Sequence, residues 1–356
     1  MTKERILKLQ NELNDDQAFL INDNSNRLYL TGFNSSAGVV FISKRKAILL
    51  IDFRYFEKAK QVVTNLEVCL LEKGDDDVLN LCKSEKIKTL YVETAYVCLE
   101  RYNQLCKKFE DIKISDENLL DSKLNQLRAV KEKYELKSIR EAQSLTEQTF
   151  SYILPRIDTT RTEREIMLDM EFFMRGLGSQ GVSFDFIVVS GKNSSLPHGV
   201  PTNQKIENGA FVTMDFGAVV NGYRSDMTRT VAINSVSEEQ KTVYNTTLNA
   251  QLAALENIKA GAVCKEVDKI ARDIIYNAGY KGCFGHSLGH GVGIDIHESP
   301  NLSPNNDAVL QSGNVITVEP GIYIENQFGV RIEDMVYVTD DGCINLTKAT
   351  KELIIL

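Results

Sequence analysis

The sequence lacks both an excess of positive charge and a long apolar run. Its 41 basic and 49 acidic side chains give a formal net charge of −8, and it has no dense lysine and arginine stripe, which argues against a nucleic-acid or anionic-membrane partner. No stretch approaches the ~18 apolar residues that span a membrane, and the N-terminal segment alternates charged with apolar residues, unlike a signal peptide. The sequence therefore predicts a cytoplasmic protein with a peptide or small-molecule partner.

Paired cysteines are also absent. The seven cysteines are odd in number and widely spaced, without a Cys-x-x-Cys pair. The sequence therefore predicts neither a disulfide framework nor a thiolate zinc site. We expect reduced side chains that are mostly buried as small apolar groups.

Glycine and proline are scarce in the first part of the chain. Before residue 155 there are three glycines and no proline, whereas the other nineteen glycines and all six prolines follow. A chain of 356 residues usually forms two domains, and we place them at residues 1–125 and 126–356. In the first, five short apolar runs alternate with helical patterns, which predicts an α/β domain. The charged segment Asp121 to Lys133 is expected to connect the two.

The second domain combines amphipathic helices with strand-like runs. Capping boxes at Thr162-x-x-Glu165 and Ser237-x-x-Gln240 predict two helix starts. The order of elements predicts an α+β layer, in which helices cover a curved antiparallel sheet. The second capped helix is expected to bury one face, made of Tyr244, Leu248, Leu252, Leu255 and Ile258.

The segment TMDFGAVVNGYRSDMTRT carries the strongest local signal. Asn221-Gly222 is a favoured two-residue turn, because both positions need positive φ, and it would pair Gly217 with Asp226. Asp215 then lies on the same face, diagonal to Asp226. Two carboxylates so placed in an apolar sheet repel each other unless a cation or a shared proton lies between them. The alternative is that both are ordinary turn or surface acids.

A second pair of acids repeats this arrangement. Glu319 and Glu333 stand on two runs joined by a loop around Asn326. A loop of odd length centred there would place the two glutamates directly opposite each other. Four carboxylates would then converge from two hairpins, and as unpaired buried ions they would cost several kcal/mol each.

The four histidines fall in one part of the chain, next to glycine or proline: His198, His286, His290 and His297. The i, i+4 spacing of His286 and His290 would suit one helix face. The glycines around them favour instead a strand or loop whose backbone can approach a ligand closely. A lone histidine is more often a satisfied core or surface residue, which is the alternative here.

Four carboxylates and one imidazole can hold two divalent ions. Oxygen-rich ligation without sulfur suits Mn²⁺, Co²⁺ or Zn²⁺. Two such ions would share a water, lower its pKa and clamp a carbonyl oxygen. The residues therefore predict hydrolysis of an amide bond.

These motifs resemble those of the pita-bread metallopeptidase family, which includes methionine aminopeptidases, prolidases and Xaa-Pro aminopeptidases. The resemblance rests on D-F-G-A…S-D-M-T-R-T, G-H-S-L-G-H-G-V-G…H-E-S-P, E-P-G-I-Y and R-I-E-D, and it covers the whole chain. It implies a creatinase-like N-terminal α/β domain, an α+β pita-bread catalytic domain and two divalent metal ions, with manganese expected and zinc or cobalt possible. The implied ligands are Asp215 as a terminal ligand, Asp226 and Glu333 as bridges, and His290 and Glu319 on the second ion.

The same resemblance implies roles for the residues around the ions. Glu319 would be the general base, and His297 would donate to the scissile carbonyl and stabilise the oxyanion. Tyr323 and Arg331 would orient the bridging carboxylates, although such residues often simply pack along a sheet. Substrate contacts are expected from His198, His286 and His297. We also expect His198 to be a catalytic residue.

The N-terminal domain and the full histidine set resemble Xaa-Pro peptidases rather than methionine aminopeptidases. Several strict dipeptidases of the family carry an arginine after H-E-x-P that holds the free C-terminal carboxylate, and here that position is Asn301. The sequence therefore favours an Xaa-Pro aminopeptidase that uses a metal-bridging hydroxide on peptides with proline at the second position. The alternatives are an Xaa-Pro dipeptidase (prolidase) and, in a different class, a non-catalytic pita-bread peptide-binding module. A homodimer is expected by analogy.

Overall fold

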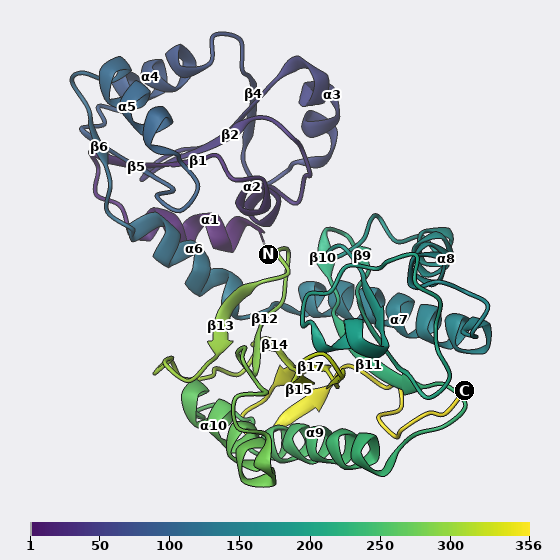
Figure 1. Cartoon of the computed structure of the whole chain (residues 1–356). Coiled ribbons are helices and arrows are strands. Elements are labelled where there is room, and N and C mark those ends of the chain that lie inside the picture. Colours follow the sequence, from purple (N-terminus) through teal and green to yellow (C-terminus); the bar gives the residue numbers. More distant parts are fainter. Residues whose placement is uncertain (1) are drawn as a thin grey trace. The chain divides into compact units, whose positions relative to one another are not determined.

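The computed structural model describes residues 2–356, and the chain divides into two compact units between Arg128 and Ala129 (Figure 1). The division falls at the end of helix α6 (Leu119–Ala129). The boundary lies inside the segment Asp121 to Lys133, which we expect to connect the two domains. Much of that segment is helical, and Leu120 and Leu124, one turn apart, are both buried. A buried apolar stripe at helical spacing outweighs the charged composition of the segment.

The first unit is built on a six-stranded mixed sheet of order β4-β3-β2-β1-β5-β6. The neighbours β1, β2 and β3 pair antiparallel, and the outer pairs are parallel. The five predicted strands are present, and the short β6 was not foreseen. The bounds are β1 Gln17–Ile21, β2 Val39–Ser43, β3 Ala47–Ile51, β4 Glu67–Leu70, β5 Thr89–Val92 and β6 Lys113–Ser115; the remaining helices are α1 Thr2–Asn11, α2 Asn24–Thr31, α3 Phe53–Val62, α4 Asp75–Ser84 and α5 Leu99–Lys108.

The second unit contains two pairs of helices that cover strands (Figure 1). The first pair is α7 (Lys133–Ile153) and α8 (Glu163–Gly176), with α8 against β7. The second is α9 (Glu238–Glu256) and α10 (Cys264–Ile275), with α9 against β14, β15 and β16. Both predicted capping boxes are formed at the starts of α8 and α9. Short turns of helix complete the set: η1 Leu154–Arg156, η2 Gly191–Ser195 and η3 Tyr276–Tyr280.

The strands of this unit pair antiparallel, as predicted. A three-stranded sheet has the order β11-β8-β7, a five-stranded sheet has the order β13-β12-β14-β17-β18, and β9-β10 and β15-β16 form two ribbons. The strands are β7 Ile187–Ser190, β8 Phe211–Phe216, β9 Val219–Val220, β10 Tyr223–Arg224, β11 Met227–Ala232, β12 Gly289–Gly291, β13 Glu298–Leu302, β14 Val315–Val318, β15 Gly321–Ile324, β16 Phe328–Arg331, β17 Asp334–Val338 and β18 Cys343–Asn345.

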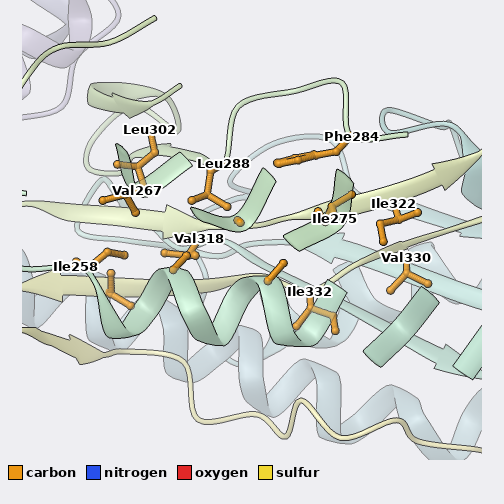
Figure 2. Close-up of a cluster of buried hydrophobic side chains, with 14 of the residues drawn as sticks. Ile258, Val267, Ile275, Phe284, Leu288, Leu302, Val318, Ile322, Val330 and Ile332 are labelled. Carbon is orange, nitrogen blue, oxygen red and sulfur yellow. The ribbon is translucent and has the colours of Figure 1, made fainter. Parts of the chain in front are cut away.

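Helices α9 and α10 and the strands that they cover enclose an apolar core (Figure 2). Val318 and Ile332 belong to this core, so Glu319 and Glu333, which follow them, are directed to the opposite face. The predicted burial of α9 is only partly correct: Tyr244 and Ile258 are buried, but Leu252 is 40% exposed. The apolar core therefore lies on one side of the two glutamate-bearing strands, and their polar residues lie on the other side.

Two further expectations concern the whole chain. Among residues 2–356, no helix has both the length and the apolar composition needed to cross a membrane. All seven cysteines are free, as predicted, but only Cys82 and Cys264 are buried. The expectation that most cysteines are buried is therefore wrong.

Candidate metal centre

The first pair of acids lies on the hairpin that the Asn-Gly turn closes, beyond the β9-β10 ribbon. Asn221 and Gly222 both have positive φ, 52° and 79°, and Val220 pairs with Tyr223. Further along the same hairpin, Asp215 of β8 is opposite Thr228 of β11. The pairing predicted from the turn is confirmed, and it places Asp226 diagonal to Asp215 on one face.

The second pair of acids also has the predicted register. Gly321 pairs with Arg331 in one ladder, and Val318 pairs with Asp334 in the adjacent ladder. Both pairings are centred on residue 326, where Asn326 has a φ of 60°. Glu319 and Glu333 lie between the two ladders and are therefore opposite each other.

The glycine-rich histidine motif is a strand and not a helix, as predicted. His290 is the middle residue of β12, and it pairs with Asn301 of β13, while Gly291 pairs with Ile316 of β14. Gly289 lies so close to β14 that a Cβ atom there would collide with the carbonyl oxygen of Thr317. The absence of a side chain at this position therefore brings His290 next to the strand that leads to Glu319.

We predict that Gly289→Ala lowers the free energy of unfolding by about 3 kcal/mol, because the overpacked backbone of β12 and β14 must separate. Gly285→Ala is the matched control, since a Cβ there meets no atom within 4 Å. Chemical denaturation of both variants measures the difference. Equal stability of the two variants would show that β14 accommodates the methyl group.

The two acid pairs and the histidine converge in space. Ligand atoms of Asp226, His290 and Glu333 lie within 4.8 Å of one another. The Nε2 atom of His290 is 3.3 Å from Oε1 of Glu319 and 3.6 Å from Oδ2 of Asp226. Asp215 is held beside this group by Arg331, whose Nη2 donates to Oδ2 of Asp215 at 2.7 Å. Three of the five expected ligands thus lie within reach of one another, Glu319 adjoins His290, and the charge of Asp215 acts on that of Asp226.

The charges of this cluster perturb each other. Burial, and then the charges of neighbouring carboxylates, raise the pKa values of Asp226 and Glu333 well above their usual range. Burial also raises the pKa of Asp215, against the opposing effect of Arg331. For Glu319, burial acts in the same direction, but the hydrogen bond and charge of His290 outweigh it and lower the pKa to about 2. The negative charge of the clustered acids thus exceeds the positive charge around them.

The donor set fits divalent cations. Atoms Oδ1 of Asp215 and Oδ1 of Asp226 are buried without a hydrogen-bond partner, which is costly for a carboxylate unless a cation lies next to it. Four carboxylates balance the charge of two divalent ions, and the donors are oxygen and imidazole nitrogen without sulfur. The residues present are therefore suited to a pair of hard or borderline metal ions.

Arg331 joins the carboxylates to two other parts of the site. Besides Asp215, it donates from Nε to the Thr228 hydroxyl at 3.0 Å and from Nη1 to the Tyr323 hydroxyl at 2.7 Å. The Thr228 hydroxyl in turn donates to Oε2 of Glu333 at 2.7 Å. Desolvation of the half-buried Tyr323 raises its pKa to about 12 and keeps its hydroxyl protonated. This network fixes the orientation of two of the acids.

His286 is bound to this network through both ring nitrogens. Nδ1 lies 2.9 Å from the carbonyl oxygen of Ser287, and Nε2 lies 2.9 Å from the hydroxyl of Tyr323. Burial lowers the pKa of His286, so the ring is neutral; Nδ1 carries its hydrogen, because a carbonyl only accepts, and Nε2 accepts from Tyr323. A direct substrate contact of His286, which the resemblance implies, remains a prediction.

The other two histidines lie beside the cluster. The ring of His297 contacts that of His290 edge-on, with 4.4 Å between centroids, and burial followed by the charge of His290 lowers its pKa. His198 is exposed, and its charge lowers the pKa of both His286 and His297. The preceding carbonyl, of Pro197, accepts from Arg331 at 3.1 Å. All four histidines are therefore gathered at one site.

Two threonines of the site were not singled out from the sequence. Thr228 connects Arg331 with Glu333, and Thr317 donates to Oε1 of Glu319 at 3.1 Å and accepts from the backbone N–H of His290. Their positions alternate with core residues along β11 and β14, so strand period was the available signal. Threonine is common in strands, and that signal alone does not separate a site residue from a packing one.

Residues 137–340 match the model of metallopeptidase family M24, and residues 5–130 match that of the creatinase/prolidase N-terminal domain. The chain belongs to metallopeptidase family M24. It is 38% identical over 344 residues to the Xaa-Pro dipeptidase of Pyrococcus horikoshii, covering 96% of this chain and 95% of that protein.

Solved structures of the family agree along the whole length. An Xaa-Pro dipeptidase from Bacillus anthracis is 40% identical with a TM-score of 0.93, covering 100% of this chain and 99% of that one. An X-Pro aminopeptidase from Thermotoga maritima is 37% identical with a TM-score of 0.90, covering 98% and 100%. The predicted creatinase-like domain followed by a pita-bread catalytic domain is thus confirmed. An M24 metallopeptidase requires divalent metal ions, and Asp226, His290 and Glu333 form a candidate site for them.

Proposed function

We propose that this M24 metallopeptidase is an Xaa-Pro aminopeptidase, which removes the first residue from peptides with proline at the second position. Relatives named as dipeptidases and as aminopeptidases share the Xaa-Pro specificity in their names. The observation that favours the aminopeptidase is the neutral residue at position 301, directly opposite His290. Opposite residues of an antiparallel pair point to the same face, so position 301 lies on the face that His290 occupies.

In this proposal the five side chains would hold two divalent ions, with Mn²⁺ favoured by the oxygen-rich donors. When bound, the ions supply Lewis acidity for a carbonyl oxygen and lower the pKa of a water. Asp215, Asp226 and Glu333 would hold the ions together with Glu319 and His290, and Asp226 and Glu333 lie within reach of His290. Arg331 and Tyr323 orient the acids through the network described above.

Glu319 acts as the general base. Its carboxylate is ionised, and Thr317 and His290 fix the direction of Oε1. It takes the proton of the water that attacks the scissile carbonyl. His297, with its lowered pKa, is neutral and donates an N–H hydrogen bond to the oxygen of that carbonyl as negative charge develops on it. His198 contacts the substrate from the exposed side.

The residue at position 301 decides between longer peptides and dipeptides. An arginine there would pair with the free C-terminal carboxylate of a dipeptide, whereas in a tripeptide that carboxylate lies one residue further away. Asn301 carries no charge, and it is exposed. The runner-up function, Xaa-Pro dipeptidase, requires another cation for this carboxylate.

We expect the protein to cleave Xaa-Pro-Yaa tripeptides at least as well as Xaa-Pro dipeptides when Mn²⁺ is added. Asn301→Arg should then raise kcat/KM for the dipeptide, relative to the tripeptide, by about tenfold, because a hydrogen bond to a charged group contributes roughly 1.5–3 kcal/mol. Asn301→Gln is the uncharged control. Exclusive cleavage of dipeptides by the unmodified protein would replace the aminopeptidase with the prolidase.

A further inference from the structure

A buried ion pair lies next to His297 and has no part in the chemistry above. Lys131 and Glu298 place Nζ and Oε2 at 2.8 Å, and their side chains are 0% and 6% exposed. Burying two charges is costly, and such a pair contributes little net stability compared with apolar residues. Its position is therefore of interest for function, since Glu298 directly follows His297 in the chain.

Both partners are held by backbone contacts. The N–H of Lys131 donates to the Gly313 carbonyl at 2.8 Å, and the side chain of Asn314 donates to the Ala129 carbonyl at 2.9 Å. Segment 129–131 is thus fixed against the start of β14. On the other side, Oε1 of Glu298 accepts from the backbone N–H of Asp295 at 3.0 Å. One carboxylate consequently connects Lys131 with the loop that carries His297.

This loop, residues 292–297 between β12 and β13, is fixed at further points. Arg224 donates its backbone N–H to the carbonyl of Gly293 and its Nε to that of Ile294, both at 2.8 Å. Gly293 leaves room for the acid, since a Cβ there would collide with the Glu298 carboxylate. Arg224 and Glu298 therefore fix the conformation of this six-residue loop, whose last residue is His297.

We propose that Glu298, held by Lys131, is a positioning residue for His297. The ion pair fixes the start of β13, and the bond to Asp295 closes the loop, so that the imidazole of His297 stays against His290 and faces the carboxylates. Misplacing a catalytic group by about 1 Å costs on the order of 100-fold in rate. This inference rests on the proposed role of His297 in the reaction.

The test is a double-mutant cycle between Glu298→Gln and His297→Ala in the Mn²⁺-loaded full chain. Glu298→Gln is expected to lower kcat roughly 10- to 100-fold, with KM and the calorimetric affinity for Mn²⁺ changed less than about threefold. In the His297→Ala background the same substitution is expected to change kcat less than about threefold. The ¹⁵N resonances of the His297 ring, recorded on the chelated protein because paramagnetic Mn²⁺ would broaden them, should shift in Glu298→Gln.

Asp169→Asn is the control for loss of an ion pair elsewhere in the unit, because Asp169 pairs with Arg161 at 2.9 Å on and near α8. It should leave kcat and the His297 resonances unchanged. Equal losses of kcat from Glu298→Gln with and without His297 would overturn the inference, as would a kcat close to normal in the single variant. Full activity of His297→Ala would instead contradict the proposed role of His297 itself, so the two failures are distinguishable.

Discussion

Replacement of Glu319 by glutamine is expected to reduce turnover by about 1,000-fold, within the range that removal of a general base produces. The amide keeps the size of the side chain and a carbonyl oxygen that Thr317 can bind, so the fold should be retained. It cannot take a proton from the attacking water, and as a neutral group it is a poorer ligand. The rate is measured with an Xaa-Pro-Yaa tripeptide at several Mn²⁺ concentrations.

Two comparisons make this result specific. Glu325→Gln is a matched control, because Glu325 lies in the loop of the same hairpin and is exposed. Saturation with Mn²⁺ separates lost ion binding from lost proton transfer, since only the first is restored by more metal. A Glu319→Gln protein with at least half of the normal activity would contradict the assignment of the base.

Asp226→Asn is expected to remove most of the stabilisation that Mn²⁺ confers on the protein. An ion at 100 times its dissociation constant stabilises the folded state by about 2.7 kcal/mol, and for a unit of this size ~1 kcal/mol corresponds to a Tm shift of ~2–4 °C. Asp226 lies within reach of His290 and Glu333. Calorimetric unfolding with Mn²⁺ and with a chelator measures the increment for each protein.

The pH dependence of the chelated protein gives a second readout of the same variant. The pKa of Asp226 in the folded protein is raised by burial and by neighbouring acids. The folded state therefore binds the proton of Asp226 more tightly than the unfolded state does. This stabilisation is complete below the unfolded pKa and is lost as the pH rises through the folded pKa. The chelated unmodified protein should therefore gain stability relative to Asp226→Asn between pH 7 and pH 5. An unchanged difference, or an equal Mn²⁺ increment in both proteins, would exclude the proposed role.

The site is predictable from sequence where a turn sets a register. The positive φ values of Asn221 and Asn326 follow from residue type, and the pairing of both hairpins then follows by counting. The strand around His290 was predictable because repeated glycine disfavours helix. The contacts of His286 were not predictable, since Tyr323 reaches it from a different hairpin. The roles of these residues in catalysis remain predictions.

The fold was less predictable where two faces of a helix competed. In α9 the leucine stripe suggested burial of Leu252, but the buried face includes Val243, Thr247 and Gln251. Gln251 donates to the carbonyl of Val318 at 3.3 Å, so a polar residue faces the sheet because the strand offers it an acceptor. Hydropathy alone ranks such a residue as exposed.

The hydroxyl of Thr228 gives the network at Arg331 a fixed polarity. A guanidinium has hydrogens to give and no lone pair to offer, so the hydroxyl oxygen receives the Nε hydrogen and its own proton is left for Glu333. With Glu333 ionised, hydrogen bonding runs in one direction, from cation through alcohol to anion. Serine at position 228 would keep both hydrogen bonds of the hydroxyl. Valine, which has the shape of threonine, would lose both. The hydroxyl group at this position therefore matters more than the volume of the side chain.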